Sequence, residues 1–129
     1  MGATPLSLAA IAAGATLGAW LRWALSLWLN SRVEAMPLGT LAANLIGGYL
    51  VGMAVGFFSD LPELAPEWRL FAMTGFLGGL TTFSTFSAES MALLQRGDYG
   101  IALLHSGGHL VGSVILCIAG FAAWRSLHS

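Results

Sequence analysis

Four long stretches without a charged residue restrict what this chain can fold into. Residues 1–21, 35–59, 70–88 and 99–124 contain no Asp, Glu, Lys or Arg. A helix crosses the hydrocarbon core of a bilayer with about 20 consecutive apolar residues. We therefore predict an all-α membrane protein, a single domain over residues 1–129 with four transmembrane helices. The predicted spans are about 6–29, 38–58, 69–94 and 100–124.

The composition excludes several other classes of protein. Charged residues make up 9% of the chain, against about 25% in soluble domains, so a water-facing surface cannot be covered. Five basic residues, none of them lysine, stand against six acids, so no nucleic-acid partner is expected. The only cysteine, Cys117, lies in an apolar stretch and rules out a disulfide framework.

The arginines between the predicted spans show no bias toward one side. Arg69 and Arg125 fall on the side of the termini, and Arg32 and Arg96 fall on the other. Since the excess of Lys and Arg in loops sets orientation, two interpretations stay open. Either the chain inserts both ways up and inverted copies pair, or a weak bias still selects one orientation. The expected location is the cell inner (plasma) membrane, crossed several times.

Small residues recur at four-residue spacing in each predicted span. Such spacing lets helix backbones approach closely in lipid, within one chain or between chains. Because four short helices leave little room for a solvated path, we expect an oligomer. The glycines concerned are Gly14, Gly18, Gly48, Gly52, Gly56, Gly75, Gly79, Gly108 and Gly112.

The third predicted span contains an unusual polar segment, TGFLGGLTTFSTFSAE, at residues 74–89. Adjacent glycines and a run of β-branched and hydroxyl residues weaken a helix. In lipid, broken backbone is tolerated only where protein buries it or where it lines a cavity. We predict a break after Gly79 that forms an ion site. The alternative is an intact helix whose hydroxyls bond the preceding turn.

Two aromatic rings and one amide are candidate ligands for an anion. Phe83 and Phe86 lie three residues apart and project from one helix face. Their positive ring edges suit an anion, although such pairs are more often lipid-facing or core residues. Asn44, in the middle of the second span, offers two amide donors, or else an interhelical hydrogen bond. Thr40, one turn earlier, shares its face.

Two charged residues near the span ends each allow two interpretations. Arg22 either reaches the interface or provides an attractive field at a pore mouth. Glu89 either pairs with a cation or completes a polar network.

A polar stripe follows the fourth span. His105, His109 and Ser113 recur every four residues, with Ser106 off that face. The stripe is interpreted as a polar seam between helices, as a weak two-histidine metal site, or as a row of donors along an ion path.

Three segments together resemble the Fluc/CrcB family of small fluoride channels. They are GATLGAWLRW in the first span, PLGTLAANLIGG in the second and TGFLGGLTTFSTFSAE in the third. The resemblance implies a dual-topology, antiparallel homodimer with two fluoride pores and a structural sodium ion at the dimer interface. It also implies passive, fluoride-selective export that protects the cell from fluoride toxicity.

The resemblance also implies roles for individual residues. Backbone carbonyls of Gly78 and Thr81 from both subunits would hold the sodium ion. Phe83 and Phe86 would present their edges to fluoride, and Asn44 would be the pore asparagine. The polar track beside them would include Ser84 and Thr85.

The fourth span departs from that family's pattern. A tyrosine followed by serines is common there, whereas this chain has His105 and His109 and then Ser113. Protonatable donors at these places suggest that conduction depends on pH.

Two other classes remain as alternatives. A four-helix multidrug or cation/proton antiporter shares the length and the balanced charges, but it needs a buried acid, and Glu89 is the only candidate. A metal-binding protein or enzyme using the two histidines lacks further ligands or a nucleophile nearby in sequence, so we expect no enzyme.

Overall fold

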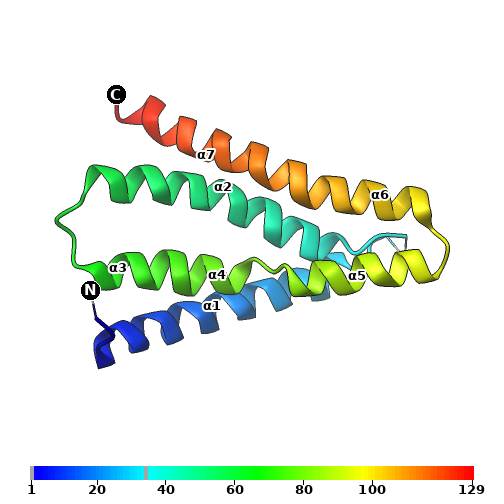
Figure 1. Cartoon of the computed structure of the whole chain (residues 1–129), viewed down its shortest axis with the longest axis horizontal. Coiled ribbons are helices and arrows are strands. Elements are labelled where there is room, and N and C mark those ends of the chain that lie inside the picture. Colours follow the sequence, from blue (N-terminus) through cyan, green and yellow to red (C-terminus); the bar gives the residue numbers. More distant parts are fainter. Residues whose placement is uncertain (1, 34) are drawn as a thin grey trace.

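The chain forms four long helical rods that run alternately in opposite directions, as the computed structural model shows for residues 2–33 and 35–129 (Figure 1). Both termini therefore lie at the same end. The first two rods are α1 (Pro5–Leu29) and α2 (Leu38–Asp60). The third comprises α3 (Pro66–Arg69), η1 (Leu70–Leu77), α4 (Gly78–Leu80) and α5 (Ser84–Gln95). The fourth comprises α6 (Tyr99–Gly107), η2 (Gly108–Gly112) and α7 (Ser113–Leu127).

The rods have the length and surface of membrane-spanning helices. Among the described residues, three helices are long and apolar enough to cross a membrane: Pro5–Leu29, Leu38–Asp60 and Tyr99–Leu127. The third rod is not among them because it is interrupted near its middle. Large side chains such as Trp20, Leu103 and Ile118 are exposed on the outside, as lipid-facing residues are. The predicted all-helical membrane fold is confirmed, and the antiparallel dimer stays a prediction.

The first helix begins at the cap that its sequence encodes. The Thr4 hydroxyl accepts a hydrogen bond from the backbone N–H of Ser7 at 3.0 Å, and the Ser7 hydroxyl accepts one from the backbone N–H of Thr4 at 2.8 Å. Pro5 fills the first helical position, where its missing N–H costs nothing. This reciprocal capping satisfies backbone groups that lipid could not.

Glycines bring the rods together in pairs. α1 packs on η1 and α4, and α2 packs on α7. A Cβ on Gly18 would collide with the backbone of Phe76 and Leu80, and one on Gly52 would collide with the backbone of Cys117 and Phe121. The spacing of these two glycines was compatible with helix packing within one chain or between chains. The structure shows that each packs against a helix of the same chain.

Two stretches of the third and fourth rods have wider, π-helical turns. η1 leads directly into the interruption of the third rod, and η2 carries His109. Such turns change the direction in which the following side chains point and are frequent at functional sites.

Replacing Gly52 with alanine tests the packing of α2 on α7. The added Cβ meets backbone atoms of Cys117 and Phe121, which cannot rotate away. We expect Gly52→Ala to lower the free energy of unfolding by roughly 1–3 kcal/mol, measured by thermal unfolding in detergent. Gly100→Ala, where a Cβ meets nothing within 4 Å, is the control. Equal stability of the two variants would contradict this packing.

Candidate ion-binding site at a helix break

The third rod is interrupted at Thr81–Phe83, one residue later than the predicted break after Gly79. Thr81 has an extended backbone, with φ −85° and ψ 154°, which ends α4. The chain resumes as α5 at Ser84. The Thr82 hydroxyl accepts a hydrogen bond from the backbone N–H of Thr85 at 3.1 Å, as a capping side chain does. The break thus follows the glycine pair and is closed by a threonine that restarts the helix.

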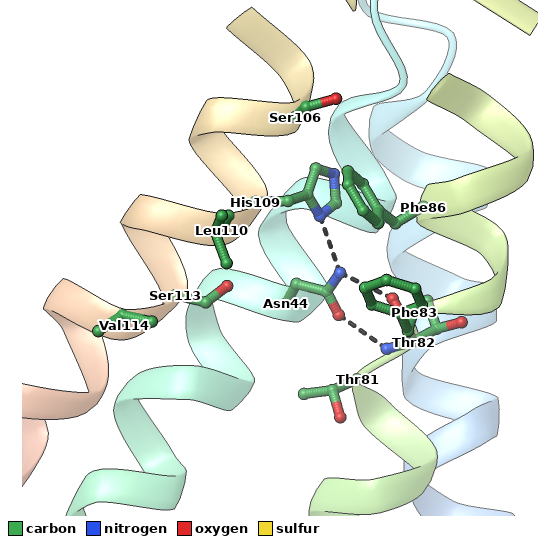
Figure 2. Close-up of a pocket in the computed structure, with 10 residues that line it drawn as sticks. All are labelled: Asn44, Thr81, Thr82, Phe83, Phe86, Ser106, His109, Leu110, Ser113 and Val114. Carbon is green, nitrogen blue, oxygen red and sulfur yellow. Dashed lines mark hydrogen bonds between the residues drawn. The ribbon is translucent and has the colours of Figure 1, made fainter. Parts of the chain in front are cut away.

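The side chain of Asn44 holds the broken segment in place. Its Oδ1 accepts the backbone N–H of Thr82 at 2.7 Å, and its Nδ2 donates to the Thr82 carbonyl at 2.9 Å (Figure 2). Both polar groups of one peptide residue are therefore satisfied by a single buried amide from α2. The sequence indicated Asn44, and it placed Thr82 among the hydroxyl residues of the break, but it did not predict the contact between the Thr82 backbone and Asn44.

Asn44 also bonds to a histidine of the fourth rod. Its Nδ2 lies 2.8 Å from Nδ1 of His109, which is 4% exposed. The other ring nitrogen of His109, Nε2, is buried and has no hydrogen-bond partner among the described residues. Figure 2 shows this nitrogen on the side of the ring that faces Phe86.

A pocket of about 490 Å³ opens beside the break. Its mostly apolar lining includes the amide of Asn44, the hydroxyl-bearing residues of the break and both buried and exposed side chains of the fourth rod (Figure 2). The lining residues are Asn44, Thr81, Thr82, Phe83, Phe86, Ser106, His109, Leu110, Ser113 and Val114. A small polar ligand entering this pocket would meet a few polar groups in largely apolar surroundings.

The two phenylalanines differ in their surroundings although they lie close together. Their ring centroids are 5.5 Å apart and the planes meet at 64°, so an edge of one ring faces the other. Phe83 is 78% exposed. Phe86 packs against His109, at 4.6 Å between ring centroids, and stacks on His105 at 5.3 Å.

A chain of hydrogen bonds extends from the pocket toward one end of the bundle. The Glu89 carboxylate accepts the Thr40 hydroxyl at 2.6 Å and lies 3.1 Å from Nε2 of His105. His105 and Thr40 are both fully buried, at 0% and 1% exposed. Of the two interpretations of Glu89, the structure supports membership of a polar network.

Two serines that the sequence analysis did not select complete this chain. The Ser90 hydroxyl lies 3.1 Å from Nδ1 of His105 and 3.3 Å from the Ser106 hydroxyl. Ser106 also lines the pocket with His109 and Ser113, although it lies off the face of the four-residue stripe. Four-residue spacing identifies only some of the residues that line the pocket, because residues from a wider arc of the fourth rod border it.

Glu89 also lines a second pocket at the end of the bundle. That pocket, of about 230 Å³, includes Asn30, Pro37 and Arg96 in its lining. The Glu89 carboxylate thus belongs both to the chain of hydrogen bonds and to the lining of this second pocket, which also includes Arg96.

Arg22 contacts the break itself. Its Nε donates to the carbonyl of Gly79 at 3.1 Å, in the last turn before the interruption. A cation at the C-terminal end of a helix stabilises its free carbonyls. The placement of Arg22 at a pore mouth stays a prediction.

The remaining predicted residues surround the break. Gly78 and Thr81 lie in the turn that ends α4, and the Thr81 hydroxyl donates to the Leu77 carbonyl at 2.8 Å. Ser84 is exposed, with its hydroxyl 3.3 Å from that of Thr82. Ser84 and Thr85 therefore belong to the first turn of α5.

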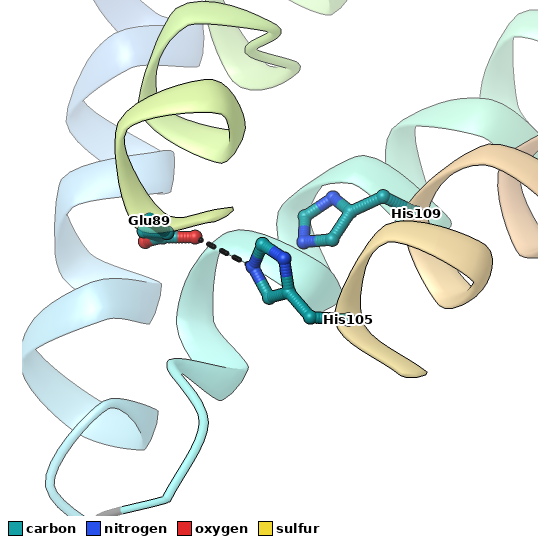
Figure 3. Close-up of side chains that lie close together, drawn as sticks. All are labelled: Glu89, His105 and His109. Carbon is teal, nitrogen blue, oxygen red and sulfur yellow. Dashed lines mark hydrogen bonds and ion pairs between the residues drawn. The ribbon is translucent and has the colours of Figure 1, made fainter. Parts of the chain in front are cut away.

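Glu89, His105 and His109 form a cluster that the spacing of the histidines alone did not reveal. One ligand atom from each lies within 4.8 Å of the others (Figure 3). The sequence analysis found no acid near the two histidines, because Glu89 reaches them from α5.

These features define a class of protein: a small four-rod membrane protein whose third helix is broken beside a donor-lined pocket. The chain belongs to the family described as CrcB-like protein, Camphor Resistance (CrcB), whose model matches residues 9–121.

Similar proteins cover almost the whole chain. A protein of Cupriavidus pinatubonensis named Fluoride-specific ion channel FluC is 59% identical over 123 residues, 95% of this chain and 98% of the relative. Proteins with the same name from Ralstonia nicotianae and Chromohalobacter salexigens are 57% and 55% identical, covering 95% of this chain and 97% and 92% of the relatives.

Replacing Thr40 tests the polar network around Glu89. Thr40→Val keeps the shape but leaves Oε2 of the carboxylate without the donor that it has at 2.6 Å. We expect a loss of about 1–3 kcal/mol in the free energy of unfolding, measured by thermal unfolding in detergent. Thr40→Ser keeps the hydroxyl and is the control. A valine variant as stable as the serine variant would show that the contact contributes nothing.

Proposed function

We propose that this chain is a fluoride-selective channel through which fluoride leaves the cell passively, protecting it from fluoride toxicity. The observation that carries the proposal is the donor-lined pocket at the helix break, in a chain whose near full-length relatives are named fluoride-specific ion channels. The cell's inner (plasma) membrane is the proposed location.

The pocket suits a small anion that has lost its water. A desolvated anion needs donors that are already oriented, because burying an uncompensated charge is costly. Ring edges of Phe83 and Phe86 carry partial positive charge, and the pocket also includes His109 and Ser113. The path would continue along His105.

Further hydroxyls on α5 and α2 lie beyond the break. Ser84 and Thr85 lie in the first turn of α5, and Thr40 bonds Glu89. Their proposed role is to complete the polar track, with the pore asparagine Asn44 at its centre. Arg22, bonded at Gly79, adds a positive charge near the break.

The direction of movement follows from the membrane potential. A potential negative inside drives a monovalent anion outward by about 2.3 kcal/mol per 100 mV. No coupled ion is needed for export under this force.

The functional unit would be an antiparallel homodimer with two pores. Phe83 is largely exposed in the single chain, which is an unusual position for a pore residue unless a second copy covers it. The balanced arginines at the two ends are compatible with insertion both ways up.

A structural sodium ion is proposed at the centre of that dimer. Backbone carbonyls at the end of a broken helix are typical sodium ligands, and Gly78 and Thr81 lie in the last turn of α4. The ion would be held by these carbonyls from both copies, and its charge would offset the cost of an anion nearby.

An antiporter is the second candidate, because Glu89 is a mostly buried acid in contact with a protonatable histidine. Efflux of fluoride and chloride from liposomes containing the purified protein separates the two functions. We expect fluoride efflux that greatly exceeds chloride efflux and persists without a pH gradient. Equal halide efflux would refute selectivity, and a requirement for the gradient would favour exchange.

The phenylalanine edges are tested by aliphatic replacement. Phe83→Ile and Phe86→Ile keep an apolar side chain but remove the positive edge, so we expect fluoride efflux to fall roughly tenfold or more, about 1.4 kcal/mol or more in the barrier. Phe57→Ile, in an aromatic cluster with Phe58 and Trp124, is the control. Unchanged efflux in both pore variants would refute the role of the ring edges.

The sodium site is tested by exchange of the cation. Replacing sodium on both sides of the membrane with a large organic cation should lower fluoride efflux or dissociate the dimer, since such a cation cannot fit among carbonyls. Size-exclusion chromatography and liposome efflux measure the two effects. Full activity of an intact dimer without sodium would argue against a required ion.

A further inference from the structure

The cluster of Glu89, His105 and His109 has a set of donor atoms that suits a transition metal ion. Two imidazoles and one carboxylate are the protein ligands of known zinc centres. One ligand atom from each side chain lies within 4.8 Å of the others, and the side chains come from α5 and the fourth rod (Figure 3). Nε2 of His105 and Oε1 of Glu89 are 3.1 Å apart, whereas two ligands of one tetrahedral zinc ion are about 3.4 Å apart. Two of the three ligands are therefore already spaced for binding.

The third ligand has a buried nitrogen that the fold does not use. Nε2 of His109 has no hydrogen-bond partner among the described residues, in a side chain that is 4% exposed. A buried polar atom without a partner costs free energy, and an ion bound to it would remove that cost. The His109 ring lies 4.5 Å from the His105 ring, measured between centroids. An ion beside it is thus within reach of the other two ligands.

Neighbouring hydroxyls orient the ligands Glu89 and His105. The Thr40 hydroxyl donates to Oε2 of Glu89 at 2.6 Å, which leaves Oε1 for an ion. The Ser90 hydroxyl lies 3.1 Å from Nδ1 of His105. It can accept the proton that Nδ1 carries when Nε2 binds a metal ion. Hydrogen bonds of this kind hold metal ligands in their binding orientation.

Asn44 limits how strongly His109 can bind. Its Nδ2 donates to the Thr82 carbonyl at 2.9 Å and lies 2.8 Å from Nδ1 of His109. A metal ion on Nε2 places the ring proton on Nδ1, where it faces the amide hydrogens of Asn44. Binding therefore breaks this hydrogen bond, and the free energy lost favours a reversible ligand over a permanent structural ion.

Two pockets give access to the cluster. Glu89 lines the pocket of about 230 Å³ at the end of the bundle, and His109 lines the pocket of about 490 Å³ beside the break. Arg96 in the smaller pocket lies 3.3 Å from the carboxylate of Asp98, which offsets its positive charge. An ion in the cluster would lie between these two pockets.

We propose that Glu89, His105 and His109 form a reversible binding site for a divalent transition metal ion such as zinc, and that the bound ion closes the fluoride path. Its effect on fluoride rests on the proposed function, in which the path continues along His105. Three protein ligands leave a fourth position of a tetrahedral ion open. Because one carboxylate only half neutralises the ion, an anion entering that position is held rather than passed on.

Calorimetric titration of zinc into the intact protein, purified without a histidine tag, tests the site. We expect one zinc ion per chain in the wild type and in His128→Gln, which changes a histidine at the exposed C-terminus. Glu89→Gln, His105→Gln and His109→Gln should each weaken binding about tenfold or more. Magnesium, which prefers oxygen ligands and water, should not bind. A wild type that binds no zinc, or a loss of binding confined to His128→Gln, would overturn the proposal.

X-ray absorption of the zinc-loaded wild type identifies the ligands without any variant. We expect two imidazole nitrogens and at least one oxygen around the ion. A shell of oxygen ligands without imidazole would overturn the site. This measurement decides the question if the three variants do not fold, as judged by size-exclusion chromatography.

Fluoride efflux from liposomes tests whether the bound ion closes the path. Zinc should slow efflux of the wild type about tenfold or more, since it occupies the path, and a chelator should restore it. Magnesium at the same concentration controls for surface charge and should have no effect. Each variant is compared with itself in the absence of zinc, and loss of any one ligand should abolish the inhibition. Undiminished efflux with zinc bound would overturn the proposed closure.

These measurements separate failure of the inference from failure of the proposed function. A wild type that passes no fluoride in the absence of metal refutes the channel, and the calorimetry still decides the metal site. A conducting wild type that binds no zinc refutes only the metal site.

Discussion

The rest of this structure depends on the hydrogen bonds between the side-chain amide of Asn44 and the backbone of Thr82. A helix interrupted in lipid exposes N–H and C=O groups that no water can satisfy, at a cost of several kcal/mol each. Asn44 satisfies both groups of Thr82 at once. Because Phe83 and Phe86 follow directly along the chain, their positions depend on this contact. The interruption is therefore a stable element on which a site can be built, rather than a local weakness.

Polar groups are concentrated along one line within an otherwise apolar molecule. They pass from Asn44 through the two histidines to Glu89, in contact with the aromatic face of Phe86. The side chains on the outside are large and hydrophobic. Electrostatic interactions are strongest where water is excluded, so a few well-oriented donors on this line have more influence on an ion than the same groups would at a wet surface.

The sequence predicted what depends on neighbouring residues and missed what depends on tertiary contact. Uncharged stretches predicted the helical rods, and the glycine pair with the following threonines predicted the break to within one residue. The contact of Glu89 with His105 joins separate helices across a turn, and that of Asn44 with Thr82 joins distant segments. Neither leaves a periodic signal. Thr82 contacts Asn44 through its backbone N–H and carbonyl, which every residue type except proline has, so its identity as threonine could not predict this contact.

The contact that stabilises the break also connects it to the fourth rod. Nδ2 of Asn44 lies 2.8 Å from Nδ1 of His109, in addition to its bond to the Thr82 carbonyl. The broken segment of the third rod, α2 and the fourth rod therefore meet at one buried amide. Because the lining of the pocket comes from these same elements, the polar groups and rings beside the break are positioned before any ligand arrives and need no reorganisation on binding.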